Sequence, residues 1–363
     1  MSAGSNLLGR LYRGESNVDF VGRQKLWYGL SIALLVLSFA GLFVRGLNFG
    51  VEFTGGSVFS FKSPTATIEQ VREAVHETGH EQVIVQQAGE NGWRVTTETM
   101  PEGEITRVQR HLAEEFDLAQ NDVSIQVIGA SWGGQVSEKA VVGLIVFMIA
   151  IIAYLSMAFE WRMALAAVVA LIHDLVITAG VYAWSGFEVT PATLLGFLTI
   201  LGYSLYDAVV VFDMIKEVTA KLTTTGKQTY TQAANGALNS TLIRSLNTTL
   251  VAILPVASIL FIGTTLLGAG TLKDLSLALF VGMLVGTYSS LCVATPLLVT
   301  LKEREPQYIA LAKRVAQRNQ ALAKAEAKAG KGKDAGKETG KETGKETVGA
   351  GGPSSPQRQR KKR

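Results

Sequence analysis

Six long apolar segments run through the sequence, and each can cross the hydrocarbon core of a membrane. They predict helices over residues 26–46, 138–158, 163–184, 191–213, 248–268 and 275–300. At 1.5 Å per residue, a helix of about 20 apolar residues spans about 30 Å of hydrocarbon. The stretch from Val141 to Phe159 contains no charged residue, which argues against the core helices of a large soluble protein. The sequence therefore predicts a polytopic α-helical membrane protein with six transmembrane helices.

Charge is distributed unevenly along the chain, and its distribution predicts the orientation in the membrane. Basic residues precede the first span, lie between the fourth and fifth spans, and follow the sixth, where residues 302–363 contain 17 Lys and Arg against 7 Asp and Glu. Residues 47–137 instead hold 13 acidic and 5 basic residues. Because basic loops stay in the cytoplasm, we expect cytoplasmic termini (1–25 and 301–363) and an extracytoplasmic segment 47–137.

The segment 47–137 has the pattern of a small α+β domain between the first and second spans. Strands are predicted at 51–62, 82–87, 93–97 and 122–128, and helices at 67–78 and 104–116. This order, βαββαβ, is that of a split βαβ sandwich, the ferredoxin-like arrangement. The remaining spans form a bundle over 138–300.

The basic tail, residues 301–363, has the composition of a disordered segment, although 305–328 could extend as a basic helix. It could bind anionic lipid or ribosomal RNA through its charge. The alternative, which we favour, is a solvated tail that only enforces the topology. The rest of the chain is net acidic, which argues against a uniformly basic nucleic-acid-binding protein.

Polar residues inside the third span are the first candidate site, because ionisable groups cost about 2.5–3.5 kcal/mol each in the membrane centre. His173 and Asp174 are adjacent within an apolar run. They could form part of a proton relay, or they could be a buried pair that fixes helix register by hydrogen bonding. The sequence leaves both interpretations open.

A carboxylate and an arginine form the second candidate site. Asp207 lies in the fourth span, about 9 Å from Asp213 along the helix, and burial disfavours its charged form. Arg244 lies near the predicted start of the fifth span, which runs antiparallel to the fourth. We expect an ion pair with Asp207 that a proton would break; the alternative is an arginine that reaches lipid headgroups.

Small residues mark the packing motifs. Gly282 and Gly286 have the small-xxx-small spacing that lets helices approach closely, and Gly55 and Gly56 interrupt the first predicted strand. The chain has a single cysteine, Cys292, which excludes a disulfide framework or a cysteine zinc site. We find no phosphate-binding loop, nucleophile elbow or HExxH motif, so we expect no enzyme activity, no metal and no cofactor.

Taken together, the motifs resemble the SecF family, whose members are subunits of the bacterial protein-export translocase and half-size members of the resistance–nodulation–division superfamily. The resemblance covers residues 19–302 and includes LNFGVEFTGG at 47–56, FEWR at 159–162, HD at 173–174, GYSLYD at 202–207, VVVFD at 209–213, LIRSLNTT at 242–249 and GTYSS at 286–290.

The resemblance implies a subunit that pairs with SecD, associates with the SecYEG channel and uses the proton gradient of the plasma membrane to pull translocating unfolded polypeptide outward. It implies that Asp207 is the proton-coupling acid, that Arg244 is its basic partner, and that Gly55 and Gly56 are the family's glycine pair. Lipid is the other expected partner, and no nucleic acid is expected apart from the tail's possible ribosome contact.

Three residues depart from the family pattern. Tyr206 stands where Asn is usual before the coupling acid, Glu52 where Asp is usual before the glycine pair, and Met214 where Arg often follows Asp213. Two other functions remain open. One is a proton-driven exporter of small molecules or lipids, against which the single small outer domain counts, and the other is a non-conducting scaffold subunit.

Overall fold

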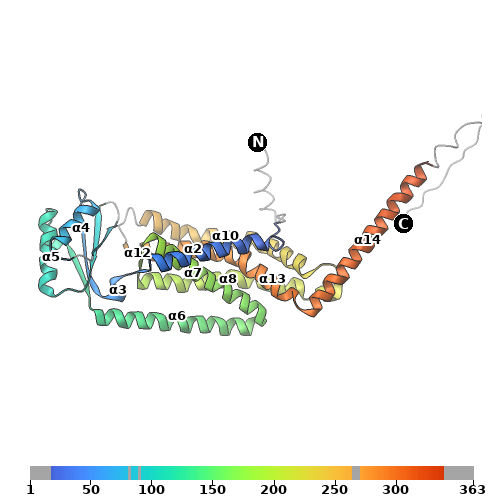
Figure 1. The fold of residues 1–363 in the computed structure, drawn as a ribbon, viewed down its shortest axis with the longest axis horizontal. Helices are drawn as coiled ribbons and strands as arrows, with labels where there is room; N and C mark the ends of the chain where they lie inside the picture. Colours follow the sequence, from blue (N-terminus) through green and yellow to red (C-terminus); the bar gives the residue numbers. More distant parts are fainter. Residues whose placement is uncertain (1–17, 81–82, 89–90, 264–269, 339–363) are drawn as a thin grey trace, which may run out of the picture. The chain divides into compact units, whose positions relative to one another are not determined.

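The computed structural model describes residues 18–80, 83–88, 91–263 and 270–338, and these are mostly helical (Figure 1). The chain divides into two compact units, Met1–Leu311 and Ala312–Arg363. Six described helices are long and apolar enough to cross a membrane, which confirms the predicted number of spans. They are α2 (Gln24–Val44), α6 (Ala130–Ala158), α7 (Trp161–Ser185), α8 (Pro191–Thr219), α10 (Tyr230–Ser258) and α12 (Gly270–Ser289).

The fifth of these helices differs most from its predicted bounds. Helix α10 begins at Tyr230, not near residue 248, and continues into a π-helical turn, η2 (Ile259–Gly263). Its first half is too polar to register as apolar, yet it is capped by Thr229, whose side chain accepts a hydrogen bond from the Gln232 backbone N–H. Arg244 is therefore in the middle of a helix and not near its start. The predicted end of this span, 264–268, lies outside the described residues.

The last span continues beyond α12 through a second π-helical turn, η3 (Ser290–Ala294), into α13 (Thr295–Glu303). After it comes α14 (Pro306–Glu338). Helix α14 contains nearly all of the stretch 305–328 that could extend as a basic helix, where an alanine-rich sequence favours helix. It continues to Glu338, so the expectation of disorder does not hold for residues 329–338. The expectation for residues 339–363 lies outside the described residues.

The segment between α2 and α6 contains a four-stranded antiparallel sheet with the strand order β3-β4-β2-β5. In chain order its elements are β2 (Gly56–Lys62), α4 (Ile68–His76), β3 (Val83–Ala88), β4 (Gly92–Thr97), α5 (Glu102–Glu115), a short 3₁₀ turn (Gln120–Asp122) and β5 (Ser124–Ile128). A core forms between sheet and helices and includes Phe59, Val71, Val95 and Leu112. Burial of such side chains stabilises each by about 1.5–3 kcal/mol relative to exposure.

The first predicted strand is wrong at its beginning. Val51–Thr54 form a short helix, α3, and the strand starts only at Gly56. Gly55 and Gly56 adopt φ values of 76° and 149°, which disfavour residues with a side chain. A Cβ on Gly56 would lie 2.4 Å from the Thr97 carbonyl oxygen. The glycine pair therefore turns the chain from α3 into the sheet while allowing close approach to β4.

A second, two-stranded sheet joins segments that are far apart in the sequence. β1 (Asn48–Phe49) follows α2 and pairs in parallel with β6 (Glu188–Val189), between α7 and α8. Gly50 extends this pairing, since its N–H donates to the Val189 carbonyl at 3.0 Å. The chain leaving the first span is thereby fixed to the loop between the third and fourth.

Helices α8 and α12 approach closely through small residues. A Cβ on Gly282 would lie 2.1 Å from Ile200 Cδ1, and one on Gly286 would lie 3.0 Å from Ser204 Cβ. On the opposing helix, a Cβ on Gly196 would lie 2.8 Å from that of Ala278. The two glycines of the small-xxx-small spacing thus lie at the contact between α8 and α12.

We expect Gly282→Leu to destabilise this contact by about 1–3 kcal/mol, because a side chain there overlaps Ile200 and forces the helices apart. The measurement is the thermal unfolding midpoint of the purified chain in detergent. Gly202→Leu, on α8, is the matched control, since no atom lies within 4 Å of a Cβ there. Equal midpoints for the two variants would show that the approach of α8 and α12 does not limit stability.

Candidate functional site within the membrane helices

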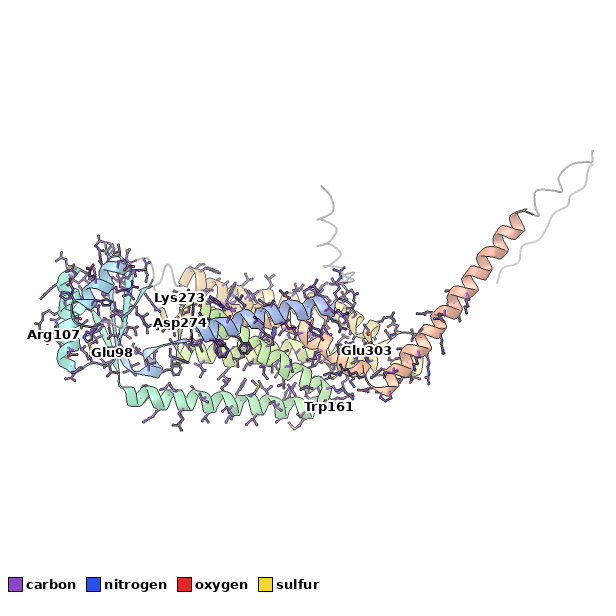
Figure 2. All side chains as sticks on the ribbon, viewed as in Figure 1. Glu98, Arg107, Trp161, Lys273, Asp274 and Glu303 are labelled. Carbon is purple, nitrogen blue, oxygen red and sulfur yellow. The ribbon has the colours of Figure 1, made fainter. Side chains whose placement is uncertain are left out.

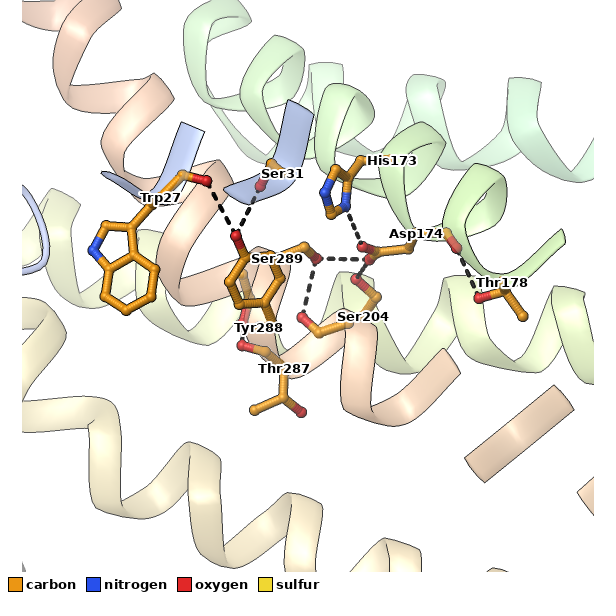
Figure 3. A network of polar contacts seen from close by, with 11 residues as sticks. Trp27, Ser31, His173, Asp174, Thr178, Ser204, Thr287, Tyr288 and Ser289 are labelled. Atoms are coloured by element: carbon orange, nitrogen blue, oxygen red, sulfur yellow. Dashed lines mark hydrogen bonds and ion pairs between the residues drawn. The ribbon is translucent and has the colours of Figure 1, made fainter. Parts of the chain in front are cut away.

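Asp174, near the middle of α7, is the most buried carboxylate of the described bundle, with 0% of its surface exposed. It accepts hydrogen bonds from Ser204 Oγ of α8 at 2.6 Å and from Ser289 Oγ of α12 at 2.7 Å, and its other oxygen lies 3.1 Å from His173 Nδ1 (Figure 3). One carboxylate therefore joins three membrane helices through neutral partners and one imidazole.

The network continues from His173 towards the first span. The His173 ring lies 6.1 Å from that of Tyr288, centroid to centroid. The Tyr288 hydroxyl shares a hydrogen bond of 2.9 Å with Ser31 Oγ of α2 and donates to the Trp27 carbonyl (Figure 3). The buried His173 Nε2 has no hydrogen-bond partner within the described residues. Asp174 is thus hydrogen-bonded to α8 and α12, whereas His173 reaches the hydrogen bonds of α2 only through its ring contact with Tyr288.

Asp207 of α8 is also buried, with 6% exposed, and therefore does not face lipid. Its two oxygens accept hydrogen bonds from Ser245 Oγ of α10 and Ser290 Oγ of η3. Hydroxyl groups can both donate and accept. The same two partners can therefore bind either a carboxylate or a neutral carboxylic acid or amide at this position.

Adjacent residues of the last span serve the two acids. Ser289 binds Asp174, and Ser290 binds Asp207. The change from α-helix to π-helix falls at this pair. Such π turns often lie at functional sites. Sequence analysis did not name these serines or Ser204 and Ser245 individually, although all four lie in the quoted motifs GYSLYD, LIRSLNTT and GTYSS. A serine in an apolar helix does not by itself show which residue it binds.

Arg244 does not join this site in the described structure. Its neighbour Ser245 binds Asp207, so the backbone of Arg244 is at the expected position, but its side chain is exposed. Among the described residues no ion pair links Arg244 to Asp207. The expected pairing within one chain is therefore not found, and α10 presents a charged group on a surface with exposed Leu250, Val251 and Leu254.

The two ends of the bundle carry further charged groups (Figure 2). At one end, Lys273 and Asp274 lie near the start of α12. At the other, the tight turn at 159–162 between α6 and α7 makes ion pairs with the end of the last span: Lys302 with Glu160, and Arg162 with Glu305. The Glu305 carboxylate also lies 3.2 Å from Lys302 Nζ.

The fold and these buried acids define a class of protein: a multi-pass membrane protein with a domain inserted after its first span and ionisable groups inside its bundle. Residues 108–304 match the family described as "Protein export membrane protein SecD/SecF, C-terminal", and residues 40–63 match the "SecD/SecF GG Motif". The second match contains Gly55 and Gly56.

Whole-chain comparisons give the same result. The chain is 49% identical to protein translocase subunit SecF of Streptomyces coelicolor over 90% of its own length and 88% of the relative. It is 39% identical to SecF of Mycobacterium tuberculosis over 87% of its length and 74% of the relative. The chain belongs to the SecF family of protein translocase subunits, as its motifs predicted. The names of these relatives indicate a role in transport.

One relative, named SecDF, is a longer protein of which this chain matches only a part. Protein translocase subunit SecDF of Thermus thermophilus is 31% identical over 80% of this chain and 39% of the relative. A crystal structure of SecDF from the same genus and species matches with a TM-score of 0.73 and 29% identity, over 80% of this chain and 39% of that one. The chain therefore corresponds to about two fifths of a longer SecDF protein, which supports a SecD partner.

Proposed function

We propose that this chain, together with SecD, uses the proton gradient of the bacterial plasma membrane to promote late translocation of unfolded polypeptide through SecYEG. Both termini would be cytoplasmic, and residues 47–137 would form an extracytoplasmic ferredoxin-like domain. The sheet order β3-β4-β2-β5 and the helices α4 and α5 support that fold. The basic residues before the first span, between the fourth and fifth spans and after the sixth support cytoplasmic termini, and thereby the extracytoplasmic location of this segment.

One observation carries the proton coupling: Asp207 is buried among three helices and bound by two hydroxyl groups, with no cation paired to it in the described structure. An ion pair would favour the charged state, whereas serine hydroxyls accommodate both states. Each proton that crosses 100 mV releases about 2.3 kcal/mol. A tenfold shift between two conformers needs about 1.4 kcal/mol, so a single proton per step suffices.

The proposal is tested in membrane vesicles that contain the chain with SecD and SecYEG. The amount of polypeptide that becomes protected from added protease is measured with and without an uncoupler that collapses the proton gradient. We expect a gradient-dependent increment that vanishes in vesicles lacking this chain. An increment of equal size without the chain would contradict the proposal.

The exposed Arg244 supports a partner at the α10 surface. A charged side chain on an apolar membrane surface needs a partner in protein or water, and a carboxylate of SecD would supply one. We expect Arg244→Leu to lower the fraction of SecD that co-purifies with the chain, while Arg244→Lys retains most of it because the charge is kept. Asn247→Leu, at an exposed position one turn further along α10, is the control. Equal SecD recovery from all three variants would show that Arg244 does not contact SecD.

A further inference from the structure

A group of charged residues lies where the inserted domain meets the membrane bundle. Arg94 of β4 has its Nη2 atom 3.7 Å from Glu52 Oε1 of α3 and 3.8 Å from Glu188 Oε2 of β6. The three side chains are 16%, 20% and 3% exposed, respectively. The Arg94 guanidinium thus lies between the carboxylate of Glu52 in α3 and the carboxylate of Glu188 in the loop between α7 and α8.

None of these contacts is a fully formed hydrogen bond, since N–H···O distances are normally 2.7–3.2 Å. Glu52 Oε2, Arg94 Nε and Glu188 Oε1 are buried, and none of them has a hydrogen-bond partner in the part of the chain that the structure describes. Buried polar groups without partners are costly. A closer contact between Arg94 and either carboxylate would give some of these atoms a partner.

The charges of the cluster do not balance. Asp274 of α12, which is 8% exposed, is close enough to Glu188, Arg94 and Glu52 for their charges to act on it. Its neighbour Lys273 adds a positive charge there. Three acids then face two bases, so full ionisation would leave one negative charge in a buried site. Burial raises the pKa of Glu188 most, Arg94 lowers it, Glu52 raises it, and the Thr96 side chain lowers it, with a net rise. The nearby Tyr182 hydroxyl donates to the Asp274 carbonyl at 2.6 Å and does not reduce the excess charge.

We propose that Glu188 is a proton-binding site at the outer end of the bundle, and that its protonation state decides which carboxylate binds Arg94. With Glu188 ionised, Arg94 is held against the loop between α7 and α8. With Glu188 protonated, Arg94 pairs with Glu52 alone, and the inserted domain is released from that loop. Because α8 also carries Asp207, this site extends the proposed function by linking proton uptake to the position of the outer domain.

Protonation of Glu188 is measured directly by infrared difference spectroscopy on the full chain with SecD in lipid vesicles, titrated with pH. Exposed glutamates ionise near pH 4.3. We expect a carboxylic acid carbonyl absorption that persists above this range and that loses one component in Glu188→Gln, while the components of the other buried acids, Asp174, Asp207 and Asp274, remain. Glu98→Gln, an exposed acid that follows β4, is the control and should keep every component. An absorption unchanged by Glu188→Gln would overturn the proposal.

Release of the domain is measured by the distance between spin labels on Arg107→Cys of α5 and Ser185→Cys of α7, both exposed, in a Cys292→Ser background. We expect the wild-type distances to shift between high and low pH, and Glu188→Gln to give the low-pH distances at every pH. Glu188→Asp, which keeps a titratable group, should retain the shift and serves if the Gln variant does not fold. Wild-type distances that ignore pH would also overturn the proposal. Neither readout depends on export, so failure here is distinct from failure of the proposed function.

Discussion

Asp207→Asn is expected to remove the whole gradient-dependent increment of polypeptide export while the protein still folds and binds SecD. The amide has nearly the same shape as the carboxyl group and can still hydrogen-bond to Ser245 and Ser290. It cannot gain or lose a proton near neutral pH. Export should therefore fall to the level that wild-type vesicles show with an uncoupler present.

The control for this prediction is Asp213→Asn, because Asp213 lies on the same helix but is exposed. It should leave the increment close to that of the wild type. Proton flux into the vesicles, measured together with export, distinguishes a proton-coupled subunit from a non-conducting scaffold subunit. If Asp207→Asn retained full gradient-dependent export, the chain would act as a scaffold, and proton coupling would have to be assigned elsewhere.

Two substitutions of Asp174 are expected to have different effects: one prevents assembly, and the other removes only gradient-dependent export. Asp174→Leu removes the acceptor of Ser204 Oγ and the partner of His173 Nδ1, both buried, and leaves Ser289 Oγ only the Gly286 carbonyl. Unsatisfied buried groups cost about 1–3 kcal/mol each, so we expect little assembled protein in the membrane. Asp174→Asn keeps an acceptor of the same shape and should assemble, but it should lose gradient-dependent export because the site can no longer exchange a proton.

The amount of chain that co-purifies with SecD measures assembly, and protease-protected polypeptide measures export. Thr178→Val is the matched control on α7. It removes a buried hydroxyl that bonds only the Asp174 backbone carbonyl, at 2.7 Å, and should affect both quantities little. Normal export by Asp174→Asn would mean that Asp174 fixes helix register and takes no part in proton transfer.

The spans could be predicted because hydrophobicity over about 20 residues is a local property. The same reasoning failed at α10, whose first half carries Asn235, Asn239 and Arg244. The amide groups of both asparagines bond the Val18 region before α2, and such contacts depend on tertiary structure. It also failed at Val51–Thr54, where the dihedral angles of two glycines, and not the apolar pattern, decide where the strand begins.

The candidate site was predictable in its acids but not in their partners. Asp174 and Asp207 stand out because charge in an apolar segment is rare. The four serines that bind them come from α8, α10 and the last span, and nothing in their local sequence shows which face of the helix meets an acid. Arg94 and Glu188 were missed for a similar reason. Both are charged residues in short strands, where exposure is the usual expectation. Their burial follows from the packing of β4 and β6 near α3.

Because neighbouring serines of one rigid element hold acids on two other helices, the acids are not mechanically independent. A rotation of the last span that draws Ser289 away from Asp174 also displaces Ser290 from Asp207. Any change of hydrogen bonding at Asp174 must then be accompanied by a change of hydrogen bonding at Asp207.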